Sequence, residues 1–241
     1  MVAGFFNVFL PGGIGGDGVR LLMAAQTLNG PFSRVAASAA VDRILGLEAL
    51  LIVAVLSCLR RLPTLTASPI LNHLAQFVGL AAGGGLVSFL ALLYLGDQTL
   101  VATLLARLGR LGRLGRFLVG LCESFPLYRR HPVMLCAALG MSLAAHLCML
   151  TAFTLFAAPS GSNLTMWDYG FVLSITQAAS CFAVVPGALG IAEALFGYLT
   201  ALLAHGETPL GSLFLGFRVV IALATAPGAL VWVGSPFRQR K

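Results

Sequence analysis

The sequence has little charge for its length. Of its 241 residues only 10% are charged, 59% are hydrophobic, and the mean hydropathy is +0.95. Soluble domains carry about 25% charged residues, so this chain cannot cover a water-facing surface. The composition argues against a soluble enzyme, a DNA-binding domain, a coiled coil and a disordered tail. It predicts an all-α fold, a polytopic bundle of transmembrane helices that forms one integral membrane domain over residues 1–241.

The chain also has almost no lysine, and it lacks the clustered cysteines and histidines that bind metals. Lys241 is the only lysine among fifteen basic residues, and the net charge is +7. In a membrane protein such an excess of arginine marks cytoplasmic loops beside anionic lipid, so we expect no nucleic-acid partner. The five cysteines form no CxxC motif, and neither a disulfide framework nor a metal site or other cofactor is expected. Because no Ser/His/Asp order, phosphate loop or HExxH motif occurs, we also expect no enzymatic activity.

Long apolar runs predict the spanning helices. A bilayer core about 30 Å thick needs about 20 apolar residues of helix. Four segments reach or approach this length: residues 44–59 and 75–95, which place two helices within 44–95, and residues 132–158 and 210–233. Residues 96–130 carry four arginines at every third position, from Arg107 to Arg116. We expect either a surface-lying segment that anionic headgroups attract or an ordinary basic cytoplasmic loop.

Two further apolar segments are broken by glycine and proline. Residues 1–28 are interrupted by PGGIGGDG at 11–18, and residues 169–204 are interrupted by PGALG at 186–190. Broken helices at membrane depth are tolerated only where protein or a wet cavity covers the loose backbone. Paired breaks are the best sequence indication of a transporter-type binding site. We therefore expect two broken segments around such a site, of a kind that can be re-entrant.

The distribution of arginine predicts the orientation. If the helix at 132–158 leaves the cytoplasm, eleven of the fifteen basic residues lie inside and only Arg60 and Arg61 lie outside. The positive-inside rule then places the C-terminus in the cytoplasm. The loop at 158–168 is external and ends at Trp167 and Tyr169, which are expected to be interface aromatics.

The first candidate site is the glycine-rich break. Gly15 and Gly16 let backbone N–H groups converge, and the following helix N-terminus favours an anion. Arg20 lies in the first turn, where it could clamp a phosphate. Asp17 could cap the helix or pair with Arg20. The alternative is a kink with a capping aspartate that serves only helix packing.

Asp42 and Arg43, at the head of the helix expected over 44–59, form a second candidate. Charges within the bilayer are costly and usually paired, so we expect each to pair with another segment, with Arg20 and Asp17 as candidates. The alternative is an interfacial charge pair at a helix end. Glu48 follows on the same helix.

The third candidate lies at the second break, where Gly187 and Gly190 precede Glu193 in the first turn of a helix. Arg218, deep in an apolar segment, needs a counter-charge, and Glu193 is the natural one. The alternative reading is a purely structural ion pair. His146, at mid-span, is expected to be a packing histidine with a satisfied ring rather than a proton relay.

Three motifs in order resemble those of a known family. They are FNVFLPGGIGGDGVR at 6–20, DRILGL at 42–47 and VPGALGIAE at 185–193. They resemble the N..LPG..GGD..R, DR..GL and PGGLG..E signatures of the lysylphosphatidylglycerol synthase/flippase membrane-domain family of bacterial and archaeal integral membrane proteins. Arg218 falls where a late arginine is common. Ala188 replaces the second glycine of the third motif, which we interpret as a mild change.

The resemblance implies a lipid-handling domain of the bacterial inner membrane. A lipid headgroup site would be lined by the charged residues and glycines of the three motifs: Gly15, Gly16, Asp17, Arg20, Asp42, Arg43, Gly187, Gly190, Glu193 and Arg218. The expected function is flippase-like, namely binding an anionic phospholipid or polyprenyl-linked lipid and moving it between leaflets. Family members usually carry further helices before the first motif, so we expect a fragment, a late-start gene model or a reduced form.

Two other functions fit the same features. One is a membrane-embedded enzyme or subunit of a glycolipid or polyprenyl pathway, without transport activity. The other is a structural partner without a substrate. The resemblance covers the membrane domain alone and not the aminoacyl-transferase domain. We therefore expect no synthase activity from this chain, and we expect it to act as a homo-oligomer or beside a separate synthase.

Overall fold

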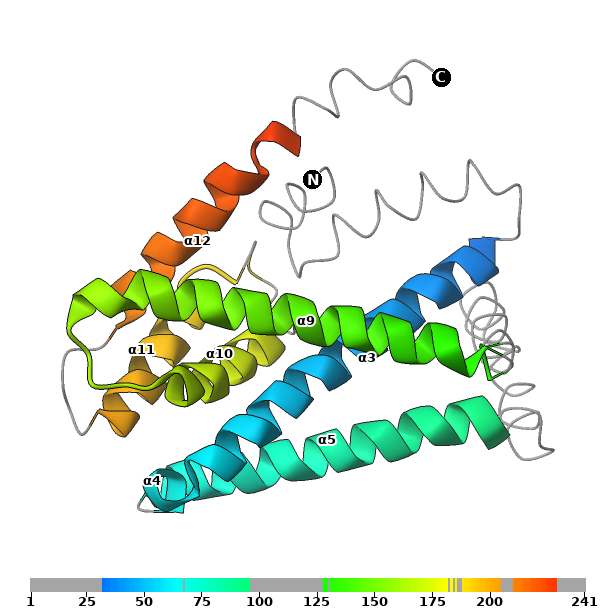
Figure 1. Ribbon diagram of the computed structural model, residues 1–241, viewed down its shortest axis with the longest axis horizontal. Helices are drawn as coiled ribbons and strands as arrows, with labels where there is room; N and C mark the ends of the chain where they lie inside the picture. The colour runs from blue at the N-terminus through cyan, green and yellow to red at the C-terminus, as the bar shows by residue number, and fades with distance from the viewer. Residues whose placement is uncertain are drawn as a thin grey trace.

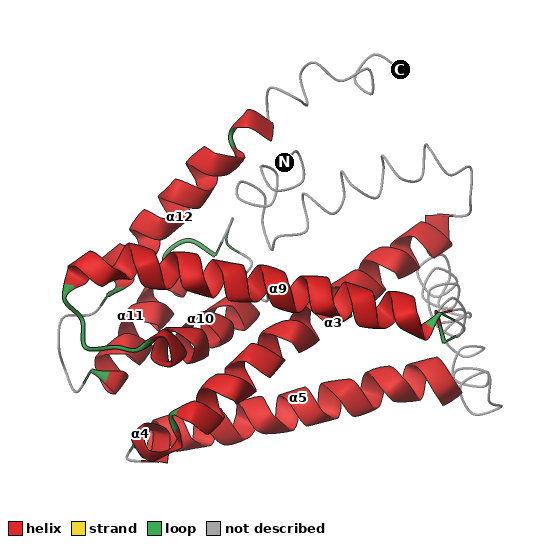
Figure 2. Cartoon of the chain, viewed as in Figure 1, coloured by secondary structure: helices red, strands yellow, loops and turns green. Residues whose placement is uncertain are grey.

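The computed structural model describes residues 32–66, 68–95, 128–129, 131–181, 183, 185, 188–204 and 210–228. Most of these residues lie in helices, and none of them forms a strand (Figure 2). The elements are α3 (Phe32–Arg60), α4 (Leu62–Thr66), α5 (Pro69–Leu95), α9 (Pro132–Ala157), η1 (Ala158–Ser160), α10 (Met166–Ser180), α11 (Ile191–Leu203) and α12 (Gly211–Thr225). The expected all-α bundle is confirmed.

Helix α3 is the centre of the bundle. It lies against α5, α9 and α10 (Figure 1). It begins twelve residues before the helix expected from hydropathy, at Phe32 rather than Ile44. Charges at Arg34, Asp42 and Arg43 lower the hydropathy of this stretch, but its alanines are strong helix formers. The charged stretch is therefore a continuous part of α3.

The bundle has two ends, which we name by their residues. The α3–α4 junction, the connection from α9 to α10 and the start of α12 lie together at the Arg60 end (left in Figure 1). The start of α3, the end of α5 and the start of α9 lie at the opposite Phe32 end. The three long helices thus run between the same two faces, as spanning helices do.

Two described spans, Pro69–Ala91 and Pro132–Ser160, are long and apolar enough to cross a membrane. Large apolar side chains project from them, including Phe77 and Leu80 on α5 and Met141 on α9. Contiguous exposed apolar surface is unfavourable in water. These helix faces suit contact with lipid.

Helices α10 and α11 form a hairpin of two short helices, which we call the re-entrant hairpin after the segment expected from the sequence. Helix α10 runs inward from the Arg60 end, and α11 returns beside it (Figure 1). With 15 and 13 residues, they measure about 22 and 20 Å at 1.5 Å per residue. Both are shorter than the bilayer core of about 30 Å. The described residues that precede α11, residues 188–190, therefore lie at the inner end of the hairpin, away from the Arg60 end.

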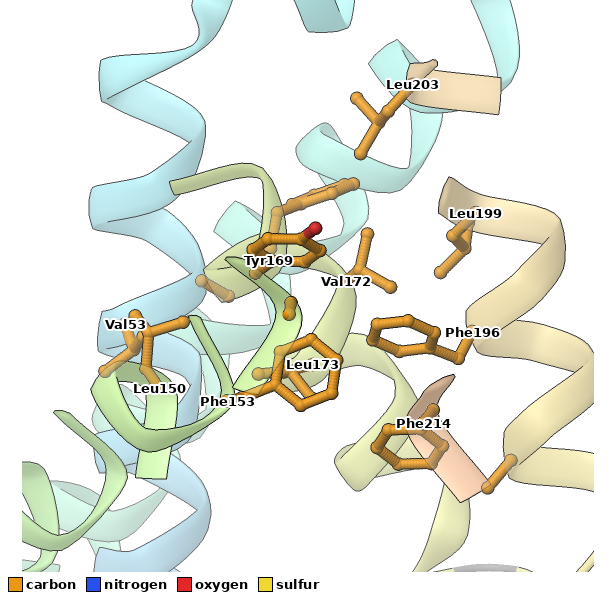
Figure 3. Packing of buried hydrophobic residues seen from close by; sticks show 14 of the residues in the cluster. Val53, Leu150, Phe153, Tyr169, Val172, Leu173, Phe196, Leu199, Leu203 and Phe214 are labelled. Atoms are coloured by element: carbon orange, nitrogen blue, oxygen red, sulfur yellow. The ribbon is translucent and has the colours of Figure 1, made fainter. Parts of the chain in front are cut away.

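An aromatic cluster holds the hairpin to the spanning helices. Phe153 of α9 is fully buried, and its ring centroid lies 5.2 Å from Tyr169 of α10, 5.2 Å from Phe196 of α11 and 5.0 Å from Phe217 of α12. All three pairs are edge-to-face, a favourable arrangement. Figure 3 shows Phe153 between the rings of Tyr169, Phe196 and Phe214. Tyr169 is 2% exposed, so its expected place as an interface aromatic is wrong.

Candidate functional site

Glu193 and Arg218 form an ion pair beside the break in the re-entrant hairpin. The Arg218 guanidinium donates from Nη1 to Oε1 of Glu193 at 2.6 Å. The second carboxylate oxygen of Glu193 accepts the Gly190 backbone N–H, also at 2.6 Å. Since Glu193 lies in the first turn of α11, its negative charge also suits the positive end of the helix dipole. The pairing that the sequence predicted is confirmed.

Helix α12 is held close to α11 at this pair. A Cβ atom added to Gly211 would lie 2.7 Å from the backbone oxygen of Glu193. Further along α12, the Arg218 guanidinium lies 5.9 Å from the centroid of the Phe214 ring, which stacks on Phe196 at 4.7 Å. Gly211 and the stacked rings of Phe214 and Phe196 thus fix the distance between α11 and α12, which the Arg218 side chain spans to reach Glu193.

The backbone of the break takes two left-handed conformations. Gly190 has φ = 85°, and Ala188 has φ = 54°. Residues with a Cβ rarely adopt this region, because it costs roughly 1–2 kcal/mol. Ala188 is also 2% exposed and belongs to the main hydrophobic cluster. The replacement of a glycine by Ala188 is therefore a strained substitution, and its interpretation as a mild change is wrong.

Asp42 and Arg43 do not lie at the head of their helix, and this expectation is also wrong. They lie ten and eleven residues after the first residue of α3, and both side chains are exposed. The reason is the early start of α3, which places Asp42 and Arg43 inside the helix, about one turn before Gly46. At Gly46 the backbone oxygen accepts a hydrogen bond of 3.1 Å from Nε2 of His146. His146 thus has the satisfied ring expected of a packing histidine.

Five predicted site residues lie outside the described residues: Gly15, Gly16, Asp17, Arg20 and Gly187. Their contacts with the second break stay a prediction. Within the described part of the chain, the structure brings together Gly190, Glu193 and Arg218. It places Asp42 and Arg43 on a separate helix.

A second ion pair, absent from the sequence-based site, lies at the Arg60 end. Nε of Arg61 donates to Oδ1 of Asp168 at 2.8 Å, and Asp168 is 1% exposed. Oδ2 of Asp168 accepts from the backbone N–H of Thr165 at 2.8 Å and from its hydroxyl at 2.6 Å. Arg60 lies 5.2 Å over the ring of Trp167. The sequence does contain a signal for this site, because Thr165 and Asp168 have the T-x-x-D spacing of a capping box at a helix start.

The two ion pairs differ in what surrounds them. Asp168 completes the N-terminal capping box of α10, so the Arg61 pair joins α3 to the start of the hairpin. Glu193 and Arg218 are 13% and 22% exposed and lie at the inner end of the hairpin. A half-buried cation beside a helix N-terminus can bind a phosphate group. No group of three metal-ligating side chains occurs among the described residues.

Comparison with known proteins identifies the family. The family model described as the lysylphosphatidylglycerol synthase TM region matches residues 1–228. None of the curated proteins matches the chain, and none of the solved structures does. The matched region covers all three motifs, and its description agrees with the apolar spans of α5 and α9. The chain therefore belongs to the family of the lysylphosphatidylglycerol synthase transmembrane region, whose description indicates a membrane protein of lipid metabolism or transport.

Proposed function

We propose that this protein is a flippase-like protein of the bacterial inner membrane that binds an anionic phospholipid headgroup and moves it between leaflets. The observation that carries the proposal is the Glu193–Arg218 pair at the break of the re-entrant hairpin. The pair lies beside the N-terminus of α11. In this proposal that place is at membrane depth, where a charged group that served no purpose would be costly.

The chemistry of the pair suits a phospholipid headgroup. A phosphate can take Arg218 as its cationic partner, with support from the N-terminal dipole of α11. If the headgroup also carries an ammonium group, that group can take the carboxylate of Glu193. The headgroup then replaces one ion pair by two, so that binding leaves no charge unpaired in the low-dielectric interior. Asp42, Arg43 and the first glycine break would extend this site.

The orientation in this proposal follows the charge distribution. Arg60 and Arg61 would face the outside, and the Phe32 end and the C-terminus would face the cytoplasm. The re-entrant hairpin then opens from the outer face, since both of its outer ends lie at the Arg60 end. A hairpin of half-length helices is a typical place for a substrate site in transporters.

The direct test is lipid movement in proteoliposomes. The protein would be reconstituted with a panel of fluorescent phospholipids and polyprenyl phosphates, and the fraction accessible to a quencher outside would be followed over time. We expect Arg218→Gln to slow movement at least tenfold. A hydrogen bond to a charged group is worth about 1.5–3 kcal/mol, and about 1.4 kcal/mol corresponds to a factor of ten. Glu193→Gln should slow the movement of lipids with a cationic group in the headgroup more than the movement of other lipids.

The chain offers a matched control in its other ion pair. Arg61→Gln also removes one arginine from an arginine–carboxylate pair, but at the outer end of the hairpin. It should lower stability without abolishing lipid movement in the protein that remains folded. Equal loss of transport in Arg61→Gln and Arg218→Gln at equal folded amounts would count against a headgroup site at Arg218. Chemical conversion of a labelled lipid by the wild type would favour a lipid-pathway enzyme instead.

A further inference from the structure

Glu48 is a buried carboxylate that the headgroup site does not use. It lies on α3 and is 7% exposed. It is twelve residues from Arg60, which corresponds to about 18 Å along the helix axis. Since the bilayer core is about 30 Å thick, Glu48 lies near the middle of the membrane. No hydrogen-bond or ion-pair partner of Glu48 is found among the residues that the structure describes.

A glycine on α5 makes room for this carboxylate. A Cβ atom added to Gly85 would overlap Oε1 of Glu48. Gly83 and Gly84, the two preceding residues, are different, because a Cβ at either position would meet nothing within 4 Å. Of the three consecutive glycines, Gly85 is the one whose lack of a side chain leaves room for the Glu48 carboxyl group. The carboxyl group of Glu48 thus occupies a place between the two helices that any other residue at 85 would fill.

The titratable groups on the neighbouring helices lie elsewhere. His73 and Tyr94 of α5 are twelve and nine residues from Gly85, about 18 and 13 Å along the helix. His146 of α9 binds the backbone oxygen of Gly46, which lies about 200° around α3 from Glu48. The other titratable or charged groups on α3 and the helices that contact it are Arg34, Asp42, Arg43, Cys58 and Arg60 on α3, Cys136 and Cys148 on α9, and Asp168 and Tyr169 on α10. None of these groups has a described contact with Glu48.

A carboxylate in this place needs a positive partner of some kind. A metal cation would need several oxygen ligands, and no group of three acidic, histidine or cysteine side chains gathers in the described part of the bundle. A proton needs only the carboxylate itself and removes its charge. We infer that Glu48 is a proton-binding site, which takes up one proton when α3 closes on α5 at Gly85 and releases it to water when this contact opens.

The site ties proton uptake to the packing of two helices. With the proton bound, the neutral acid fits against the backbone of α5 at Gly85. Without it, the carboxylate is a buried charge with no partner among the described residues, which favours any arrangement that gives it water. Proton binding therefore changes the free energy of the α3–α5 contact. This inference does not depend on lipid movement, because the proposed headgroup site is built on α11 and α12.

The test uses dicyclohexylcarbodiimide, an apolar reagent that reacts with protonated carboxyl groups in membranes. The full chain in nanodiscs would be treated from acidic to alkaline pH, and the adduct at Glu48 would be measured by mass spectrometry of its peptide. We expect the adduct to fall several-fold as the pH rises. A water-soluble carbodiimide should leave Glu48 unmodified. Gly85→Ala should reduce the adduct several-fold, because the new methyl group displaces the carboxyl group.

Gly84→Ala is the matched control, and its Glu48 should form as much carbodiimide adduct as Glu48 of the wild type. An infrared spectrum gives a second readout that needs no reagent access. The C=O stretching band of a neutral carboxylic acid should be present in the wild type and absent in Glu48→Gln. The inference is overturned if these two spectra coincide in that region at every pH at which the protein is folded. It is also overturned if Gly85→Ala and Gly84→Ala react alike.

Discussion

Arg61, the residue directly after α3, and Asp168 of α10 join the end of one helix to the beginning of another, with 2.8 Å between Nε and Oδ1. The same carboxylate caps α10 through the backbone and hydroxyl of Thr165. One buried aspartate thus fixes both the start of the re-entrant hairpin and its position on the central helix. This joint sets the direction in which α10 enters the membrane.

Asp168→Asn should destabilise the protein by about 2–3 kcal/mol. It weakens an N-terminal cap, worth about 1 kcal/mol, and removes a charge-assisted hydrogen bond, worth about 1.5–3 kcal/mol. Arg61→Gln should cost less, about 1 kcal/mol, because Arg61 is 32% exposed and water replaces part of the interaction. Thermal unfolding in detergent measures both. An equal loss in the two variants would show that the cap contributes nothing.

Gly170→Ala should separate α3 from α10. A Cβ atom at position 170 would lie 2.5 Å from Oγ of Ser57 and 3.2 Å from Cδ2 of Leu150. Overpacking of this kind costs about 1–3 kcal/mol. Gly140→Ala is the control, since a Cβ there would meet nothing within 4 Å, and it should match or exceed the stability of the wild type. We expect the melting temperature of Gly170→Ala to fall below that of Gly140→Ala, and equal melting temperatures would contradict the close contact at Gly170.

Ala188→Val should be much worse than Ala188→Gly. A β-branched residue is a severe outlier at φ = 54°, and we expect a loss of about 2 kcal/mol or more. Glycine removes the left-handed strain of roughly 1–2 kcal/mol but loses about 0.8 kcal/mol of buried methyl group, together with some backbone entropy. The net change for Ala188→Gly should therefore stay within about 1 kcal/mol. Thermal unfolding measures both variants. If Ala188→Val were as stable as Ala188→Gly, residue 188 would not have the left-handed backbone conformation.

Single cysteines test the proposed orientation. Asn163, in the loop before α10, and Arg129, before α9, are both exposed and lie at opposite ends of the bundle. In a variant whose native cysteines are replaced by alanine, Asn163→Cys should react with an impermeant maleimide on intact cells. Arg129→Cys should react only after the membrane is permeabilised. The reverse pattern would overturn the cytoplasmic location of the C-terminus.

Hydropathy predicted the apolar helices well and the charged one poorly. The segment expected at 132–158 is α9 followed by a short 3-10 turn, with a start at Pro132 in both. The segment expected at 75–95 begins earlier, at Pro69. Helix α3 begins twelve residues early, since helix formation depends on local propensity and not on the apolar content that hydropathy measures. The second break begins at Cys181 rather than at Pro186, because α10 ends with Ser180.

The candidate site was partly predictable for a similar reason. Glu193 follows a glycine break and Arg218 lies in an apolar helix, so the need to pair buried charges was enough to join them. Asp168 was missed because it follows a loop, where an aspartate is usually solvated. Glu48 was noticed as a charge within an apolar helix, but its position against Gly85 depends on how α3 meets α5.

By itself the sequence determined that the chain forms apolar helices and that a helix must break before Ile191, because apolar length and glycine content act locally along the chain. Only the tertiary structure decided which charges are buried and what they meet. Asp168 contacts a residue 107 positions earlier, and Arg218 contacts one 25 positions earlier. No spacing rule fixes such distances. They are set by how closely the helices approach, which depends on the packing of side chains such as Phe153 and on the lack of a side chain at Gly211.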